Sequence, residues 1–125
     1  MSYLMSPRED QKRSLIDAQT LIAALGRQWP AADVSTFSPA ERVYVVEWRM
    51  TLSHGLLLGG FSRNGQAISL DGDLEDCAEV ALWFRTLIAA DTRLWFYDQG
   101  YNYDIEVTPA TTARQIVDAF VDASS

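Results

Sequence analysis

The amino-acid sequence predicts a single domain of the α+β class, with the element order α-β-β-β-α-β-β-α and a mostly antiparallel five-stranded sheet with helices packed on it. The chain has 125 residues, and two domains of half that length would each lack a sufficient core. Hydrophobic residues make up 48% of the chain, which is ample for a packed interior, and their spacing alternates between helical and strand periods. We therefore expect one domain over residues 1–125, with frayed ends at 1–6 and 123–125.

The first helix is expected over about residues 7–25. The sequence SPRE at 6–9 has the form of a capping box, with a hydroxyl at the N-cap, Pro at the first helical position and Glu at the third. Apolar residues then recur at helical spacing as far as Leu25, and Gly26 followed by Pro30 marks the end of the helix.

Two strands are expected next. Residues 42–52 place apolar side chains at every second position, which is the period of a strand. A turn at 53–55 leads into a second strand over 56–61, where Gly59-Gly60 weakens the strand and indicates a bulge.

A hairpin then joins the second strand to a third. Asn64-Gly65 is the strongest hairpin signal in the chain, because both residues tolerate positive φ. A two-residue loop at this point pairs Phe61 with Ile68 and places the third strand at about 67–70.

A second helix is expected over about 74–90. Asp73 is a favourable N-cap residue, and the acids of the first turn suit the helix dipole. The side chains expected to face the core recur at helical spacing: Cys77, Val80, Ala81, Phe84, and Leu87 with Ile88.

The chain is expected to close with a second hairpin and a third helix. Strands at about 93–98 and 101–107 flank Gln99-Gly100, and Thr111 or Thr112 begins the helix. The apolar stripe of that helix consists of Ile116, Val117, Phe120 and Val121.

The two faces of the second hairpin differ in character. With Gln99-Gly100 as a two-residue loop, Trp95 lies opposite Asp104. One face is then a core face with Leu94, Phe96, Tyr101, Tyr103 and Ile105. The other combines Trp95 and Tyr97 with charged side chains, which suits a protein interface because Trp and Tyr anchor binding hot spots. Alternatively, another element covers these two aromatics.

The net charge of −7 arises from about a third of the chain. Between positions 71 and 106, nine acids accompany two arginines, a difference of seven, while the other eight acids and eight bases cancel. Such a surface repels nucleic-acid phosphates and attracts a basic protein, although charge can also serve solubility alone. The expected partner-binding residues are Asp71, Asp73, Glu75, Asp76, Arg93, Trp95, Tyr97, Asp104 and Glu106.

The sequence gives no support for catalysis, and we expect no metal, no cofactor and no enzyme activity. One Cys and one His are too few for a zinc site, and the acids at 71–75 lack the glycine and glutamate spacing of an EF-hand. A dyad of Cys77 and His54 is disfavoured, because Cys77 lies on an apolar helix stripe and such thiols are commonly inert. His54 is expected to be a turn residue.

The protein is expected to be cytoplasmic, with no membrane contact. No apolar run approaches the roughly 20 residues of a membrane-spanning helix, and the first residues lack the pattern of a secretory signal. A single cysteine excludes an internal disulfide and suits a reducing compartment.

Residues 69–88 and 94–120 resemble small cytosolic immunity proteins that are encoded beside secreted bacterial toxins. The resemblance lies in SLDGDLEDCAEVALWFRTLI and LWFYDQGYNYDIEVTPATTARQIVDAF. It implies a non-catalytic protein that neutralises a cognate toxin by occupying its active site or substrate groove. The acidic hairpin face and helix start would be the contact if the toxin has a basic site.

The expected element order is also similar to that of class I type III secretion chaperones. That resemblance implies a small acidic homodimer that binds an effector segment. The strand at 42–52 is long for that family and the last helix is short, so the immunity function is preferred. An enzyme or small-ligand binder would need a pocket that the sequence does not reveal.

Overall fold

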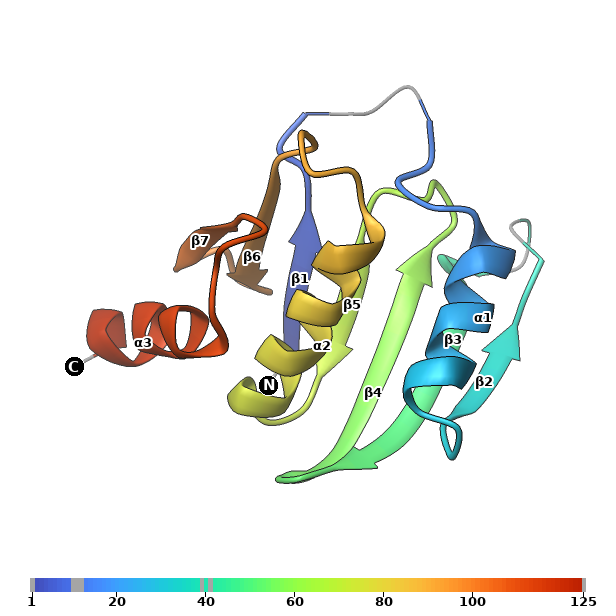
Figure 1. The fold of residues 1–125 in the computed structure, drawn as a ribbon, viewed down its shortest axis with the longest axis horizontal. Helices are drawn as coiled ribbons and strands as arrows, with labels where there is room; N and C mark the ends of the chain where they lie inside the picture. Colours follow the sequence, from blue (N-terminus) through green and yellow to red (C-terminus); the bar gives the residue numbers. More distant parts are fainter. Residues whose placement is uncertain (1, 10–12, 39, 41, 125) are drawn as a thin grey trace.

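An antiparallel sheet with three helices on one face forms the frame of the protein (Figure 1). The computed structural model describes residues 2–9, 13–38, 40 and 42–124. Its elements are β1 (Ser2–Ser6), α1 (Ala18–Gln28), β2 (Asp33–Thr36), β3 (Tyr44–Leu52), β4 (Gly55–Ser62), β5 (Ile68–Asp71), α2 (Leu74–Leu87), β6 (Leu94–Asp98), β7 (Asp104–Val107) and α3 (Ala113–Ser124). The strands lie in the order β2-β3-β4-β5-β1-β6-β7, and all neighbours are antiparallel.

The α+β class and the antiparallel sheet are confirmed, but the prediction of five strands is wrong. The described residues form seven strands, because β1 and β2 were not expected. When these two are set aside, the remaining elements follow the expected order α-β-β-β-α-β-β-α. The sheet is therefore extended at one edge by β2 and completed in its interior by β1.

Strand β1 replaces the frayed start that was expected at residues 1–6. It lies between β5 and β6 and pairs with both, and its Tyr3 and Met5 side chains are buried. Five residues with two buried side chains are too short a pattern to distinguish a strand from a loose end. At the other terminus, α3 continues to Ser124, and Ser125 lies outside the described residues.

Helix α1 begins eleven residues later than expected, at Ala18 instead of residue 7. Asp17 is its N-cap, and the Asp17 carboxylate accepts hydrogen bonds from the backbone N–H groups of Gln19 and Thr20. The expected capping box at 6–9 is wrong because Ser6 pairs with Trp95 in the sheet. Residues 10–12 of the expected helix lie outside the described residues.

Strand β2 has no hydrophobic signal of its own. Only Val34 among its four residues is apolar, and the strand pairs at the sheet edge with the nine-residue β3. A long strand offers backbone partners along its whole length, so even a short polar segment can pair with it.

Helix α2 and the hairpin before it match their predictions closely. Asp73 caps α2, and the expected core residues Cys77, Val80, Ala81 and Phe84 are buried. The helix ends at Leu87, three residues before the expected end. In the β4–β5 hairpin Phe61 lies opposite Ile68 as expected, and Gly65 has a φ of 71°.

The glycines of β4 admit two aromatic rings from β3. A Cβ atom at Gly59 would lie 2.0 Å from Cε2 of Trp48, and one at Gly60 would lie 2.9 Å from Cγ of Tyr44. The expected bulge at these glycines is wrong, since the shift in register lies in β3 between Tyr44 and Val46. Close approach of the neighbouring strand's side chains explains the glycines.

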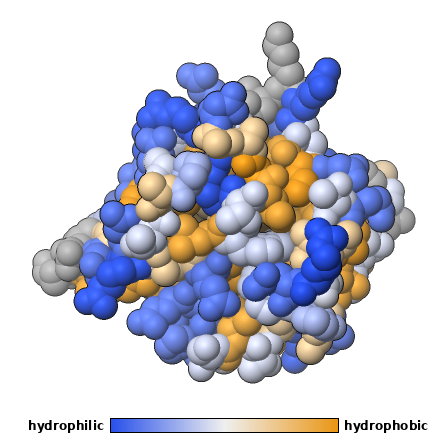
Figure 2. Space-filling model, in the orientation of Figure 1, coloured by the Kyte–Doolittle hydropathy of each residue, from blue (hydrophilic) through white to orange (hydrophobic). Residues whose placement is uncertain are grey.

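The helices bury one face of the sheet and leave the other open. Alternate strand residues are buried on the helix side: Tyr3, Met5, Val46, Trp48, Leu57, Phe61, Ile68, Leu70, Leu94 and Phe96. Figure 2 views the molecule from this side, where polar residues surround an apolar area near the centre. None of the described helices combines the length and apolar character needed to cross a membrane.

Candidate functional site

The β6–β7 hairpin has a longer loop than the sequence suggested. Trp95 lies opposite Glu106, and Tyr97 lies opposite Asp104, so the expected register is wrong by two residues. The Asp98 carboxylate accepts backbone N–H groups from the loop, at 2.7 Å from Asn102 and 3.0 Å from Tyr103. These hydrogen bonds lower the pKa of Asp98 and stabilise the five-residue loop 99–103.

The expected faces of the hairpin survive this error, because a shift of two residues leaves each strand residue on the same side. Leu94 and Phe96 are buried against the helices, while Trp95 and Tyr97 lie on the helix-free face. The prediction fails only in the longer loop and its flank: Tyr101 is 51% exposed and Tyr103 is 38% exposed.

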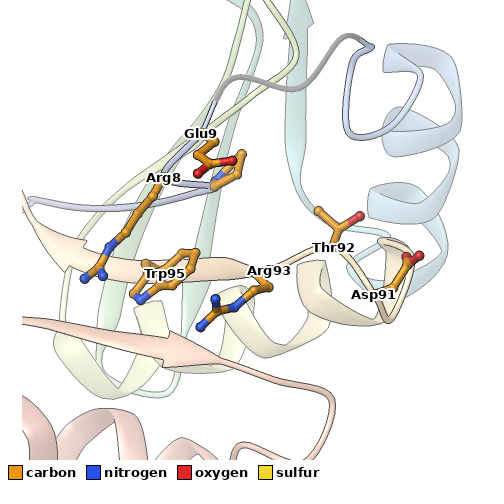
Figure 3. A pocket seen from close by; sticks show the side chains of 7 residues that line it. Arg8, Glu9, Asp91, Thr92, Arg93 and Trp95 are labelled. Carbon is orange, nitrogen blue, oxygen red and sulfur yellow. The ribbon is translucent and has the colours of Figure 1, made fainter.

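Trp95 is stacked against two arginines, Arg8 from the segment after β1 and Arg93 two positions before Trp95. The guanidinium carbon of Arg8 lies 4.4 Å from the centroid of the indole ring, and that of Arg93 lies 4.8 Å from it. In Figure 3 the two guanidinium groups lie on either side of the Trp95 side chain. Contacts of this kind combine cation–π attraction with a fixed position for the aromatic ring.

Both arginines also form ion pairs with β7. Arg8 pairs with Asp104, and Arg93 donates two hydrogen bonds to Glu106, of 3.0 and 2.9 Å. The hydrogen bond with Arg93 lowers the pKa of Glu106, and the same contact raises the pKa of Arg93. We name these five residues, Arg8, Arg93, Trp95, Asp104 and Glu106, the Trp95 cluster.

Tyrosines extend the Trp95 cluster across the helix-free face. The hydroxyl of Tyr97 on β6 lies 2.7 Å from the hydroxyl of Ser6 on the neighbouring strand β1, so the phenol reaches from one strand to the next. The ring of Tyr97 lies 4.6 Å from that of Tyr101, measured between centroids. An aromatic surface therefore runs along β6, beside Ser6 of β1, to the tip of the hairpin.

A cavity of about 490 Å³ adjoins the Trp95 cluster (Figure 3). Its walls come from the segment after β1 and from the segment before β6: Pro7, Arg8, Glu9, Asp91, Thr92, Arg93 and Trp95. Two positive and two negative side chains line it, so it presents no excess of either charge. The cavity by itself therefore selects no ionic ligand.

Arg85 braces one wall of this cavity from inside the protein. Its side chain is buried, and it donates hydrogen bonds to the carbonyl oxygens of Ile88, Ala89 and Thr92, the last at 2.6 Å. Desolvation lowers the pKa of Arg85, although the negative charge of Asp91 opposes that effect. The loop before β6 is thus held by the C-terminal turn of α2.

The structure does not bring the remaining expected contact residues to the Trp95 cluster. Asp71 lies opposite Ser2 of β1, whereas Trp95 lies opposite Ser6, four residues or about 14 Å further along that strand. Asp73, Glu75 and Asp76 surround the N-terminal end of α2. The nine expected residues therefore form two separate groups.

The group at α2 is organised around His54 in the β3–β4 turn. Asp76 is buried and binds both the backbone N–H and the ring of His54, while Asp73 caps the helix. Oxygen and nitrogen atoms of His54, Asp73 and Asp76 lie within 4.8 Å of one another. These atoms already take part in hydrogen bonds with one another and with the backbone, so the arrangement is a hydrogen-bonded network.

The thiol of Cys77 is not an activated nucleophile. It is buried, and desolvation raises its pKa to about 12, so it stays protonated at neutral pH. His54, the other member of the dyad considered above, is engaged with carboxylates of α2.

Sequence reasoning missed Arg8 and Arg85. Arg8 was assigned to a helix, and Arg85 lies on a helix with no local sign of burial. Their contacts are tertiary, and the pairing of Arg8 with Asp104 joins residues 96 positions apart. The chain matches no model of a known protein family, no curated protein and no solved structure.

Proposed function

We propose that this chain is a non-catalytic protein-binding domain that acts as an immunity protein and neutralises a cognate bacterial toxin by occupying its active site or substrate groove. The observation that carries the proposal is the Trp95 cluster on the helix-free face, with Tyr97 and Tyr101 beside it. Trp, Tyr and Arg are the residues most enriched in binding hot spots.

The cluster is arranged before any partner arrives, which favours tight binding. Trp95 is stacked against two guanidinium groups, and Tyr97 is hydrogen-bonded to Ser6. Side chains that already hold their bound positions lose little conformational entropy on association. An aromatic surface of this kind is suited to a partner with its own apolar anchor.

The charge of the chain supports a basic partner. The net charge is −7, and a toxin that acts on nucleic acid or nucleotides has a positive site of its own. Opposite charge accelerates encounter and suppresses wrong partners. We place this interaction in the cytosol, where the single cysteine, Cys77, would remain reduced.

Surface plasmon resonance against the toxin encoded beside this gene tests the proposal. Trp95→Ala should speed dissociation by about 30-fold or more, because loss of a hot-spot anchor commonly costs about 2 kcal/mol. Leu56→Ala is the control, since Leu56 is 47% exposed on β4. It should dissociate at the parent rate.

Equal dissociation of Trp95→Ala and the parent would show that the cluster is not the interface. If the parent binds no neighbouring gene product but forms a homodimer that holds an unfolded effector segment, the chaperone function replaces this proposal.

A further inference from the structure

His54 lies in the turn between β3 and β4 and is the only histidine of the chain. Both of its ring nitrogens contact carboxylates of α2. Nδ1 lies 2.9 Å from Oδ1 of Asp76, and Nε2 lies 3.1 Å from Oε2 of Glu75. The backbone N–H of His54 also donates to Oδ2 of Asp76, at 3.0 Å.

This geometry suits the protonated imidazole. A neutral ring carries one proton, so one of its nitrogens would direct a lone pair at a carboxylate oxygen. The imidazolium carries protons on both nitrogens and can donate to Asp76 and to Glu75 together. Asp73 adds a third negative charge, with Oδ1 lying 3.7 Å from Nδ1.

Asp76 depends on His54 for its partners. Its side chain is only 4% exposed, and a carboxylate so buried is costly unless it is hydrogen-bonded and faces a positive charge. Glu79 and Arg114 line the same region. Arg114 pairs with Asp118 on its own helix, at 3.2 Å, so His54 is the residue able to carry a positive charge that contacts Asp76 among the described residues.

We propose that His54 and Asp76 form a pH-sensitive latch, which holds the β3–β4 turn against α2 while the imidazole is protonated and loosens when the proton is lost. Ser53 and His54 form part of the wall of a cavity of about 440 Å³, which Leu82 of α2 and Val117 of α3 also line. The latch therefore sets the position of that wall. It does not depend on the proposed immunity function.

The direction of the pH dependence follows from the contacts. The hydrogen bond to Asp76 is the largest effect and raises the pKa of His54 above its ordinary value of 6.5. Desolvation opposes it, and the charges of Asp73, Asp76 and Glu75 add to the increase. A raised pKa in the folded state means that the latch contributes fully below about pH 6.5. Its contribution is lost as the pH rises through the folded pKa.

Proton NMR gives a direct test, because a tag-free protein has a single imidazole to titrate. The midpoint should lie above 6.5 in the parent, and Asp76→Asn should lower it, each unit corresponding to tenfold weaker proton binding. Glu106→Gln, an acid remote from the turn, is the control and should leave the midpoint unchanged. Glu75→Gln should lower the midpoint by less than Asp76→Asn does. If Asp76→Asn does not fold, the decrease in the midpoint of Glu75→Gln becomes the test.

Hydrogen exchange distinguishes a latch from a mere hydrogen bond. Protection of the His54 backbone N–H, corrected for the intrinsic rate, should fall as the pH rises through the measured midpoint. In His54→Gln that protection should not change over the same range. A midpoint at or below 6.5, or protection in the parent that does not follow the midpoint, would overturn the proposal.

Discussion

Arg93, just before β6, and Glu106 on β7 form a bidentate ion pair, with hydrogen bonds of 3.0 and 2.9 Å, while the same guanidinium stacks on Trp95. The guanidinium group of Arg93 is thereby held by both a carboxylate and an aromatic ring. Exposed ion pairs contribute little to stability on average. We therefore assign to the Arg93–Glu106 ion pair the role of orienting Trp95. We expect that role to appear in partner binding and not in stability.

Reversing the charge of Glu106 should slow association with a basic partner. Glu106→Lys is expected to reduce the association rate at low salt, because steering by opposite charge is weakened. The difference from the parent should shrink toward 1 M salt, where the Debye length is about 3 Å. Surface plasmon resonance at several salt concentrations measures both effects, and circular dichroism checks the fold.

Glu79→Lys is the matched control for this variant, since Glu79 is an exposed acid on α2 and its reversal changes the net charge equally. If both variants slow association to the same extent, the steering comes from the overall charge. The partner would then not approach the hairpin preferentially.

Truncation of Phe84 should destabilise the protein strongly. Phe84 lies on the sheet-facing side of α2, is fully buried and contacts the ring of Phe61. Phe84→Ala is expected to lower the free energy of unfolding by about 3–5 kcal/mol, through lost burial and the cavity left behind. Val121→Ala, at a position that is 52% exposed, should cost less than about 1 kcal/mol in the same urea titration. A similar cost for the two would show that Phe84 is not a core residue.

Gly59 tests the close approach of Trp48 to β4. Gly59→Ala places a methyl group where the indole ring now lies, and such overpacking typically costs about 1–3 kcal/mol. Gly26→Ala is the control. Gly26 lies in helix α1, and a Cβ atom added there would have no other atom within 4 Å. Gly26→Ala should raise the free energy of unfolding by about 0.5–1 kcal/mol. Thermal melts that show Gly59→Ala as stable as the parent would contradict this close packing of Trp48 against β4.

Local patterns determined a large part of this fold. The cap at Asp73, the buried stripe of α2, the Phe61–Ile68 pair and the faces of β6 all depend on residues within a few positions of one another. Thr112 also caps α3 as expected, with its hydroxyl accepting the backbone N–H of Gln115 at 3.2 Å. Periodicity and capping act over such distances, so a single sequence contains the signal.

The remaining features depend on contacts between residues far apart in the chain. The short β1 is a strand because β5 and β6, more than sixty residues away in the chain, supply its backbone partners. The same long-range pairing brings Arg8 to Trp95 and takes Asp73, Glu75 and Asp76 away from it. Asp76 meets His54 because a turn and a helix distant in sequence pack together. Contacts of this kind leave no period in the sequence, since they depend on where the chain returns and not on the residues beside them.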